Sequence, residues 1–240
     1  MSNTTIPVNT ILNADCIAGM KSMPDLSADM TLTDIPYGEI RTVSSLRRDA
    51  NPKHVATRMR NQDKETAGEI MFDLDEFLEQ VCRVTRGGIY IFCGINQLTY
   101  IHQYFKYQKH KDFMVRQCAW KKTNPSTMNG QHQWLSSMEN CVFAKRRQAK
   151  FNYCCKSAVW EFPTGRSKYH PTEKPLKLFK YLIEASSDVG DLVFDPCIGS
   201  GTTAVAAFEL GRKYFGYELD KEYYDGCMKR LYGVRGEICD

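Results

Sequence analysis

The sequence predicts an α/β protein built on a doubly wound, mostly parallel β-sheet. Short apolar, β-branched segments alternate with amphipathic segments along almost the whole chain. One of them, 89–93, is a continuous apolar run, which is expected of a strand covered on both faces. The chain has 240 residues, of which 42% are hydrophobic, so it is long enough for one such domain with an insertion.

In chain order, the predicted strands are short and end in polar residues or turns. Seven strands are expected, at residues 10–12, 28–33, 89–93, 113–120, 140–144, 192–194 and 214–217. Apolar residues at helical spacing predict six helices, at residues 17–23, 73–84, 97–107, 176–186, 202–210 and 222–231. Pro175 is well placed at the first turn of one helix, and Gly211 closes another. The segments without a clear period are expected to be loops or irregular: 39–70, 121–138 and 145–169.

The cysteines and the charges narrow the class of protein. None of the ten cysteines forms a C-x-x-C pair, so we expect reduced thiols in the cytoplasm and no metal site. No apolar run reaches the length of a membrane span. The net charge of +4 is unevenly spread, with seven basic against two acidic residues in 41–64 and nine against two in 121–168. Such stretches suit a polyanion such as DNA or RNA, although two solvated loops would have the same composition.

A glycine-containing turn follows the predicted strand 192–194 and opens the next helix. Gly199 and Gly201 let the backbone approach a ligand, and the helix N-terminus supplies free N–H groups. Glu218 ends the following strand, where an acid accepts hydrogen bonds from ribose hydroxyls. The glycine spacing also fits a dinucleotide fingerprint, which keeps a nicotinamide oxidoreductase open as an alternative. Asp195, ahead of the glycines, is better placed for a cation such as the α-amino group of a methionine moiety.

The tetrapeptide Asp34-Ile35-Pro36-Tyr37 ends another predicted strand. Open sheets bind ligands beyond the carboxyl ends of their strands, so we expect this end and the glycine turn to share one crevice. Pro36 restricts Ile35 to extended geometry, so the Asp34 carboxylate and the Ile35 carbonyl can together accept the two hydrogens of an amino group. Tyr37 can stack on a flat base. Alone the tetrapeptide reads as an ordinary turn; beside the glycine turn it becomes a candidate catalytic site.

Taken together, these segments resemble the β-type amino-methylating DNA methyltransferases. Members carry an Asp-Pro-Pro-Tyr-like motif before the cofactor motif Asp-Pro-x-x-Gly-x-Gly, an order that is circularly permuted relative to other methyltransferases. Further segments match in order: Asn13-Ala14-Asp15-Cys16, the run from Arg86 to Phe92, Trp120-Lys121-Lys122, the run from His170 to Pro175, Leu210-Gly211-Arg212 and Tyr217-Glu218-Leu219-Asp220.

The resemblance implies a Rossmann-like methyltransferase fold and S-adenosylmethionine as cofactor. It implies catalytic roles for Asp34, Ile35, Pro36 and Tyr37. It implies cofactor contacts for Asp15, Cys16, Lys174, Asp195, Pro196, Cys197, Gly199, Ser200, Gly201, Thr202, Glu218 and Leu219. It divides the chain into a catalytic half at 1–122 with the loop 39–70, a target-recognition insertion at 123–168, and a cofactor-binding half at 169–240.

The expected reaction is methylation of adenine N6 in double-stranded DNA, with the target base flipped out of the duplex. Asp at the first catalytic position is typical of the adenine-N6 members, whereas Ile35 stands where the family usually has Pro. The required carbonyl exists in either residue, so we expect activity. The alternatives are a cytosine-N4 or an RNA adenine methyltransferase, or a non-catalytic nucleic-acid-binding protein that keeps the cofactor site. The resemblance also implies a homodimer.

Overall fold

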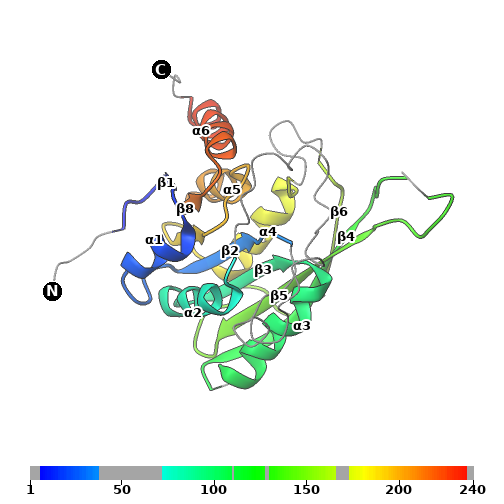
Figure 1. The fold of residues 1–240 in the computed structure, drawn as a ribbon, viewed down its shortest axis with the longest axis horizontal. Coiled ribbons are helices and arrows are strands. Elements are labelled where there is room, and N and C mark those ends of the chain that lie inside the picture. Colours follow the sequence, from blue (N-terminus) through cyan, green and yellow to red (C-terminus); the bar gives the residue numbers. More distant parts are fainter. Residues whose placement is uncertain (1–5, 38–71, 110, 128–129, 166–172, 237–240) are drawn as a thin grey trace, which may run out of the picture.

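The computed structural model describes residues 6–37, 72–109, 111–127, 130–165 and 173–236 (Figure 1). The predicted loop at 39–70 lies outside these ranges, as do residues 170–172 of the segment that ends at Pro175.

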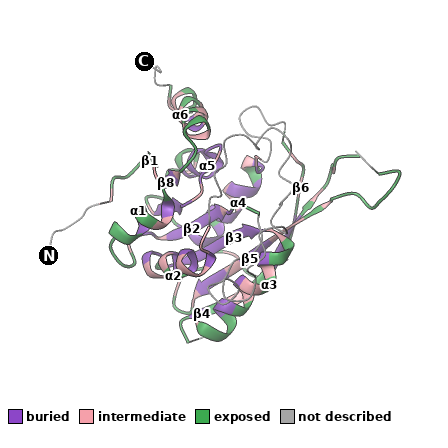
Figure 2. Ribbon diagram, viewed as in Figure 1, coloured by how far each residue is buried: buried purple, intermediate pink, exposed green. Residues whose placement is uncertain are grey.

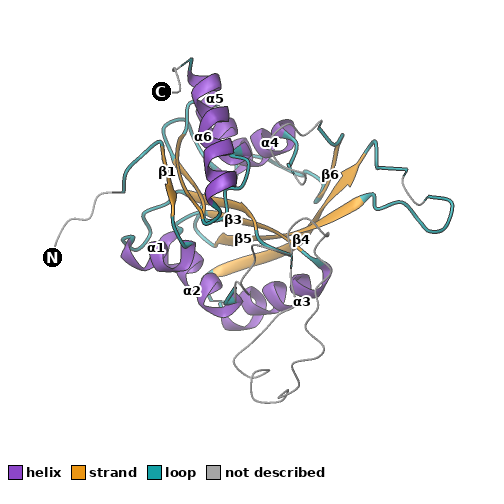
Figure 3. Ribbon diagram, turned by 45° about the horizontal axis from the view of Figure 1, so that its top comes forward, coloured by secondary structure: helices purple, strands orange, loops and turns teal. Residues whose placement is uncertain are grey.

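One sheet runs through the middle of the molecule (Figures 1 and 3). Within the described residues it has eight strands in the order β1-β8-β7-β2-β3-β5-β4-β6. Only β5 runs against the others. The strands are β1 (Thr10–Asn13), β2 (Met30–Asp34), β3 (Gly88–Cys93), β4 (Phe113–Lys122), β5 (Met138–Arg146), β6 (Val159–Phe162), β7 (Leu192–Asp195) and β8 (Lys213–Glu218).

Helices cover both faces of the sheet, which confirms the predicted doubly wound architecture (Figure 3). One face carries α1 (Cys16–Ser22), α2 (Leu74–Val84) and α3 (Ile95–Gln103), with α3 continuing into the π-helical turn η2 (Tyr104–Gln108). The other face carries α4 (Leu176–Ser186), α5 (Thr202–Glu209) and α6 (Lys221–Arg235). None of the helices in the described ranges is long and apolar enough to cross a membrane.

Strand β3 shows why its sequence is apolar throughout. Ile89, Ile91 and Cys93 pack into the core beneath α1, α2 and α3. Tyr90 and Phe92 point the other way, into the core beneath α4, α5 and α6. Since successive side chains of a strand alternate between faces, a strand between two helical layers needs apolar residues at every position. Figure 2 shows this burial along the central strands.

The strand count of seven was wrong, because the segment 145–169 contains the additional strand β6. Among the described strands, this edge strand pairs only with β4 and buries a single large side chain, Trp160. Its sequence therefore lacks the apolar run from which a strand is predicted. Strands β4 and β5 also extend further than predicted, to Lys122 and from Met138, because they pair as a long antiparallel hairpin. Its outer residues Lys121, Lys122 and Glu139 are polar and gave no apolar pattern. Parts of the segment 123–168 therefore belong to the central sheet.

The order in which successive strands are added to the sheet reverses between β2 and β7. From β7 the chain moves through α5 to β8 on one side, and from β2 through α2 to β3 on the other. The two strands are parallel neighbours, with Thr31 opposite Phe194. Their carboxyl ends therefore lie side by side at the switch point, where open α/β sheets bind ligands.

Candidate active site

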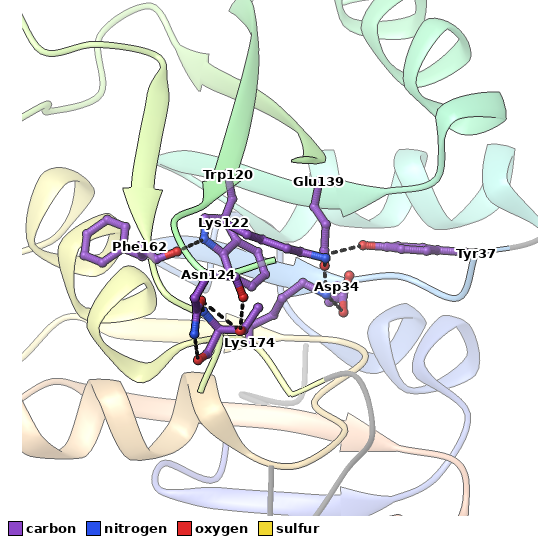
Figure 4. A network of polar contacts seen from close by, with 9 residues as sticks. Asp34, Tyr37, Trp120, Lys122, Asn124, Glu139, Phe162 and Lys174 are labelled. Carbon is purple, nitrogen blue, oxygen red and sulfur yellow. Dashed lines mark hydrogen bonds and ion pairs between the residues drawn. The ribbon is translucent and has the colours of Figure 1, made fainter. Parts of the chain in front are cut away.

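The carboxylate of Asp34 lies at the end of β2 in a desolvated position. Its Oδ2 accepts a hydrogen bond from the Lys174 ammonium (Figure 4). Its Oδ1 is buried and has no hydrogen-bond partner among the described residues. Burial raises the pKa of Asp34, and the Lys174 charge opposes that rise. One carboxylate oxygen is thus anchored by Lys174, and the other is a buried acceptor without a hydrogen bond from the described residues.

Lys174 belongs to a line of four charged side chains that alternate in sign. Its side chain is only 4% exposed, and its Nζ lies 3.0 Å from Glu139 Oε2 as well as against Asp34. The other oxygen of Glu139 lies 2.8 Å from Lys122 Nζ. Burial alone would lower the pKa of Lys174, but its two carboxylate neighbours raise it. Burial would likewise raise the pKa of Glu139, but the two lysines lower it. Both shifts favour the charged forms of Lys174 and Glu139.

The rest of the tetrapeptide is held by neighbouring elements. The backbone N–H of Ile35 donates to the Phe92 carbonyl at 3.2 Å, which continues the pairing of β2 with β3. The Pro36 carbonyl accepts from Gln97 Nε2 at 2.9 Å, and Gln97 Oε1 accepts from the Gly94 N–H at 2.9 Å. These bonds fix the exit of β2 against the start of α3.

Tyr37 is 44% exposed, so it is not enclosed in the core. Its hydroxyl donates to Glu139 Oε2 at 3.3 Å, and the Lys174 Nζ lies 5.5 Å from its ring centroid. The ring is therefore connected to the same charged line that anchors Asp34.

The glycine turn follows β7, and both of its glycines adopt left-handed backbone conformations. A Cβ on Gly201, which has a φ of +78°, would lie 2.5 Å from Cys227 Sγ, so this glycine is required for packing against α6. A Cβ on Gly199, with a φ of +51°, would meet nothing within 4 Å. The Gly199 N–H donates to Glu218 Oε2 at 2.9 Å, which joins the turn to the end of β8.

Asp195 is buried at the end of β7. Its carboxylate accepts a hydrogen bond from Thr203 Oγ1 at 2.5 Å and another from the Cys197 N–H at 3.1 Å. Burial raises the pKa of Asp195 to about 7, although the Thr203 hydrogen bond acts in the opposite direction. This carboxyl is poised to respond to a cation beside it.

The ends of β1 and β8 complete this side of the site. The Ala14 N–H donates to the Glu218 carbonyl at 3.0 Å, and Asp15 caps α1 by accepting from the Ala18 N–H at 2.7 Å. The neighbouring thiol of Cys16, together with burial, holds the pKa of Cys197 well above its usual range. The structure therefore brings together the predicted residues Asp15, Cys16, Asp195, Pro196, Cys197, Gly199, Glu218 and Leu219.

Three predicted cofactor residues have other contacts. Lys174 lies with Asp34 and Glu139. Ser200 Oγ and Thr202 Oγ1 lie 3.2 Å apart, and both accept from Arg230 of α6, at 3.3 and 3.1 Å. Their hydroxyls thus brace the start of α5 against α6.

Sequence reasoning missed Glu139, Lys122, Gln97, Thr203 and Arg230. Glu139 directly precedes the predicted strand 140–144, and Gln97 begins a predicted helix, so both looked like ordinary boundary residues. Two of the five had a signal: Lys122 lies in a segment that matches the family, and Thr203 lies in the first turn of the helix that the glycine turn opens.

Comparison with known proteins decides which family this arrangement represents. A family model described as DNA methylase (N6_N4_Mtase) matches residues 28–229, a range that contains both strand ends. The chain belongs to this DNA methylase family. The methylase is 29% identical over 259 aligned positions to the type II methyltransferase M.HinfI of Haemophilus influenzae, covering 95% of this chain and 69% of that protein. It is 25% identical to M2.LlaDCHI of Lactococcus lactis subsp. cremoris, covering 92% and 88% of the two chains.

Solved structures support the same fold for the methylase. The M1.HpyAVI–SAM complex superposes with a TM-score of 0.66 at 25% identity, covering 92% of this chain and 99% of that one. The cytosine-N4-specific PvuII DNA methyltransferase superposes with a TM-score of 0.65 at 13% identity, covering 97% and 93%. The second likeness concerns the fold alone.

Proposed function

We propose that the methylase transfers a methyl group from S-adenosylmethionine to the N6 amino group of adenine in double-stranded DNA. The observation that carries this proposal is the adjacency of Asp34 and Asp195 at the carboxyl ends of β2 and β7. One end presents an acceptor for an amino group, and the other presents an acidic and glycine-lined site for a charged nucleoside.

The residues present fit S-adenosylmethionine. Gly199 faces open space and leaves room for a ligand beside the backbone. Asp195 offers a carboxyl to an α-amino group, while Asp15 and Glu218 offer acceptors to the nucleoside portion. When bound, the cofactor supplies an electrophilic methyl group. The structural relative M1.HpyAVI was crystallised with SAM, which supports the same choice here.

In this proposal the protein acts on the base by positioning and electrostatics. The free Asp34 Oδ1 and the Ile35 carbonyl accept the two amino hydrogens, and Asp34 stabilises the positive charge that grows on the nitrogen. Tyr37 stacks on the base after it has left the duplex, a step that costs a few kcal/mol of unpairing and unstacking. No covalent bond between enzyme and base is required.

Adenine N6 is preferred to cytosine N4 because an Asp, and not a Ser, occupies the first position of the tetrapeptide. The matching family spans both kinds of amino methylation. Mass spectrometry of nucleosides from methylated duplex DNA separates the two, since the products differ in the base that gains the methyl group.

We assign target recognition to the segment 123–168, and above all to the end of the β4–β5 hairpin, which projects from the body of the molecule (Figures 1 and 3). The described residues 123–127 and 130–137 carry Asn, Gln, Ser, Thr and His side chains and no Lys or Arg. Asn and Gln side chains can pair with adenine in the major groove, and Ser and Thr can also hydrogen-bond to base edges. Residues 1–122 and 169–240 then supply the catalytic and the cofactor-binding half.

A cytoplasmic location and a homodimer complete the proposal. The location is supported by nine free cysteines among the described residues and by DNA as the substrate of the family. Sedimentation of the purified protein tests the dimer.

The decisive experiment replaces Asp34 by Ala. Removing the amino-group acceptor should reduce methyl transfer to duplex DNA by about 100-fold or more, as for the loss of a group that stabilises transition-state charge. S-adenosylmethionine binding, measured by calorimetry, should change little. Asp188→Asn, which alters an exposed ion pair with Lys150, serves as the control. Unchanged turnover in Asp34→Ala would refute the catalytic role.

A further inference from the structure

The charged line Asp34–Lys174–Glu139–Lys122 joins elements that are far apart in the sequence (Figure 4). Asp34 ends β2, Lys174 precedes α4, Glu139 is the second residue of β5, and Lys122 ends β4. Two acids and two bases alternate, so the line is neutral as a whole although it is largely buried. Breaking one member of such a set leaves an uncompensated charge behind.

Glu139 has contacts to both groups that the proposed reaction needs. It lies 3.0 Å from the ammonium that anchors Asp34, and it accepts the Tyr37 hydroxyl at 3.3 Å through the same oxygen. Its second oxygen is held by Lys122 at 2.8 Å, so the carboxylate cannot turn away from either contact.

We propose that Glu139 is a positioning residue for methyl transfer: by sharing Lys174 with Asp34 and accepting the Tyr37 hydroxyl, it sets the direction of the carboxylate and of the ring that receive the target base. This inference rests on the proposed function. Two opposing carboxylates hold the Lys174 ammonium between them. Among the described residues, Asp34 is then hydrogen-bonded through Oδ2 alone, and Oδ1 keeps its capacity to accept the amino group.

The proposal has a signature in the pH dependence of the reaction, because transfer requires ionised Asp34. The groups that act electrostatically on Asp34, or that it acts on, are Lys174, Glu139, Tyr37, Cys93 on β3, Cys141 on β5 and Asp195 on β7. The negative charge of Glu139 raises the pKa of Asp34. Glu139→Gln removes that charge and should move the acid limb of the rate profile to lower pH.

Lys122→Gln should have the opposite effect on the profile. Without Lys122, the Glu139 carboxylate keeps only Lys174 as a cationic partner and competes more strongly for it. The interaction between the Lys174 ammonium and the Asp34 carboxylate is then weaker, and the pKa of Asp34 should rise. A residue that served only to hold the fold together would not produce shifts of opposite sign in these two variants.

The experiment measures single-turnover methyl transfer to duplex DNA as a function of pH for wild type, Glu139→Gln, Lys122→Gln and a control. The control is Glu209→Gln, which removes a comparable ion pair with Lys180 at the far end of α5. We expect Glu139→Gln to be about 10- to 100-fold slower at its optimum, as for a misplaced catalytic group. Cofactor affinity should be unchanged in all variants, and the control should match wild type in rate and profile.

The outcomes separate the inference from the proposed function. Wild-type protein that binds S-adenosylmethionine but methylates no DNA would overturn both. Active wild type together with Glu139→Gln of equal rate and profile would overturn the inference alone. If Glu139→Gln does not fold, judged by its thermal transition, Lys122→Gln decides. A shift of its acid limb to higher pH supports the inference, and an unshifted limb overturns it.

Discussion

At the scale of single residues, Asp195 is a carboxyl whose ionisation changes near neutral pH. Its pKa is raised to about 7 by burial, so near neutral pH it is divided between its two forms. A cation placed beside it favours the ionised form and lowers the pKa. Binding of a ligand with an α-amino group should therefore drive off the proton that Asp195 carries below about pH 7.

We predict that S-adenosylmethionine binding at a pH just below 7 releases about half a proton, because Asp195 is about half protonated there. Asp195→Asn should bind more weakly and release none. Calorimetry in two buffers of different ionisation enthalpy measures the proton directly, because the apparent heat changes with the buffer. Asp188→Asn should behave like wild type. A wild-type binding heat that is the same in both buffers would contradict a contact between Asp195 and the amino group.

Residue identities within one motif were predictable, and partners between motifs were not. Asp34, Asp195 and Glu218 each follow a recognisable strand, so the sequence indicated them. Glu139 and Lys174 contact Asp34 from more than 100 residues away in the chain. Their roles depend on the order of strands in the sheet, which no local pattern contains.

At the scale of elements, the turn between β7 and α5 contains a matched pair of glycines. Replacing either glycine by Ala should lower the free energy of unfolding by about 1–2 kcal/mol, because both adopt left-handed conformations. Only at Gly201 would the new methyl group also collide with Cys227. We predict that Gly201→Ala lowers the free energy of unfolding by a further 1–3 kcal/mol, roughly, as in overpacked cores. Urea denaturation of both variants measures the difference.

Cofactor affinity should separate the same two variants in the opposite way: Gly199→Ala, the less destabilised variant, should lose more affinity for its size of destabilisation than Gly201→Ala. A methyl group on Gly199 points into open space beside Glu218, where the proposal puts the nucleoside. Gly199→Ala should therefore weaken S-adenosylmethionine binding more than its small loss of stability explains. Equal affinity of Gly199→Ala and wild type would remove Gly199 from the proposed cofactor site.

The β4–β5 hairpin presents Trp134, whose side chain is 98% exposed. A fully exposed indole on a projecting hairpin contributes nothing to the core, whereas stacking on a base that has left the duplex stack is worth about 1–3 kcal/mol. We predict that Trp134→Ala weakens binding to duplex DNA by roughly 5- to 100-fold, with thermal stability and cofactor affinity unchanged. Fluorescence anisotropy measures the affinity. Val189→Ala, at an exposed apolar position before the amino end of β7, should bind DNA like wild type.

Periodicity identified most elements but not their full extent. The central strands and the helices of both layers were predicted because their apolar residues repeat at the spacing that burial demands. Strand β6 was missed because a four-residue edge strand needs only one buried side chain, Trp160. The ends of the hairpin were missed because backbone pairing, and not burial, holds them together.

At the scale of the whole molecule, the first and last parts of the chain interleave in one sheet. β1 pairs with β8, and β2 pairs with β7. Neither half can keep its sheet intact when the other unfolds. We therefore predict one cooperative thermal transition, monitored by calorimetry, and not two.

The cofactor should stabilise that single transition as a unit. A ligand present at about 100 times its Kd adds about 2.7 kcal/mol to the free energy of unfolding. The transition should therefore move to higher temperature without splitting when S-adenosylmethionine is added. Two transitions, of which only one responds to the cofactor, would contradict this interleaved arrangement.

The stem of the hairpin also constrains how the specificity of this enzyme can be engineered. Lys122 and Glu139 sit where the hairpin leaves the sheet, and both belong to the charged line that ends at Asp34. A grafted hairpin from a relative would bring its own residues to those two positions. Chimeras that exchange only the segment between them should change the DNA sequence that is methylated, whereas chimeras that also replace them should bind the new sequence and modify it slowly.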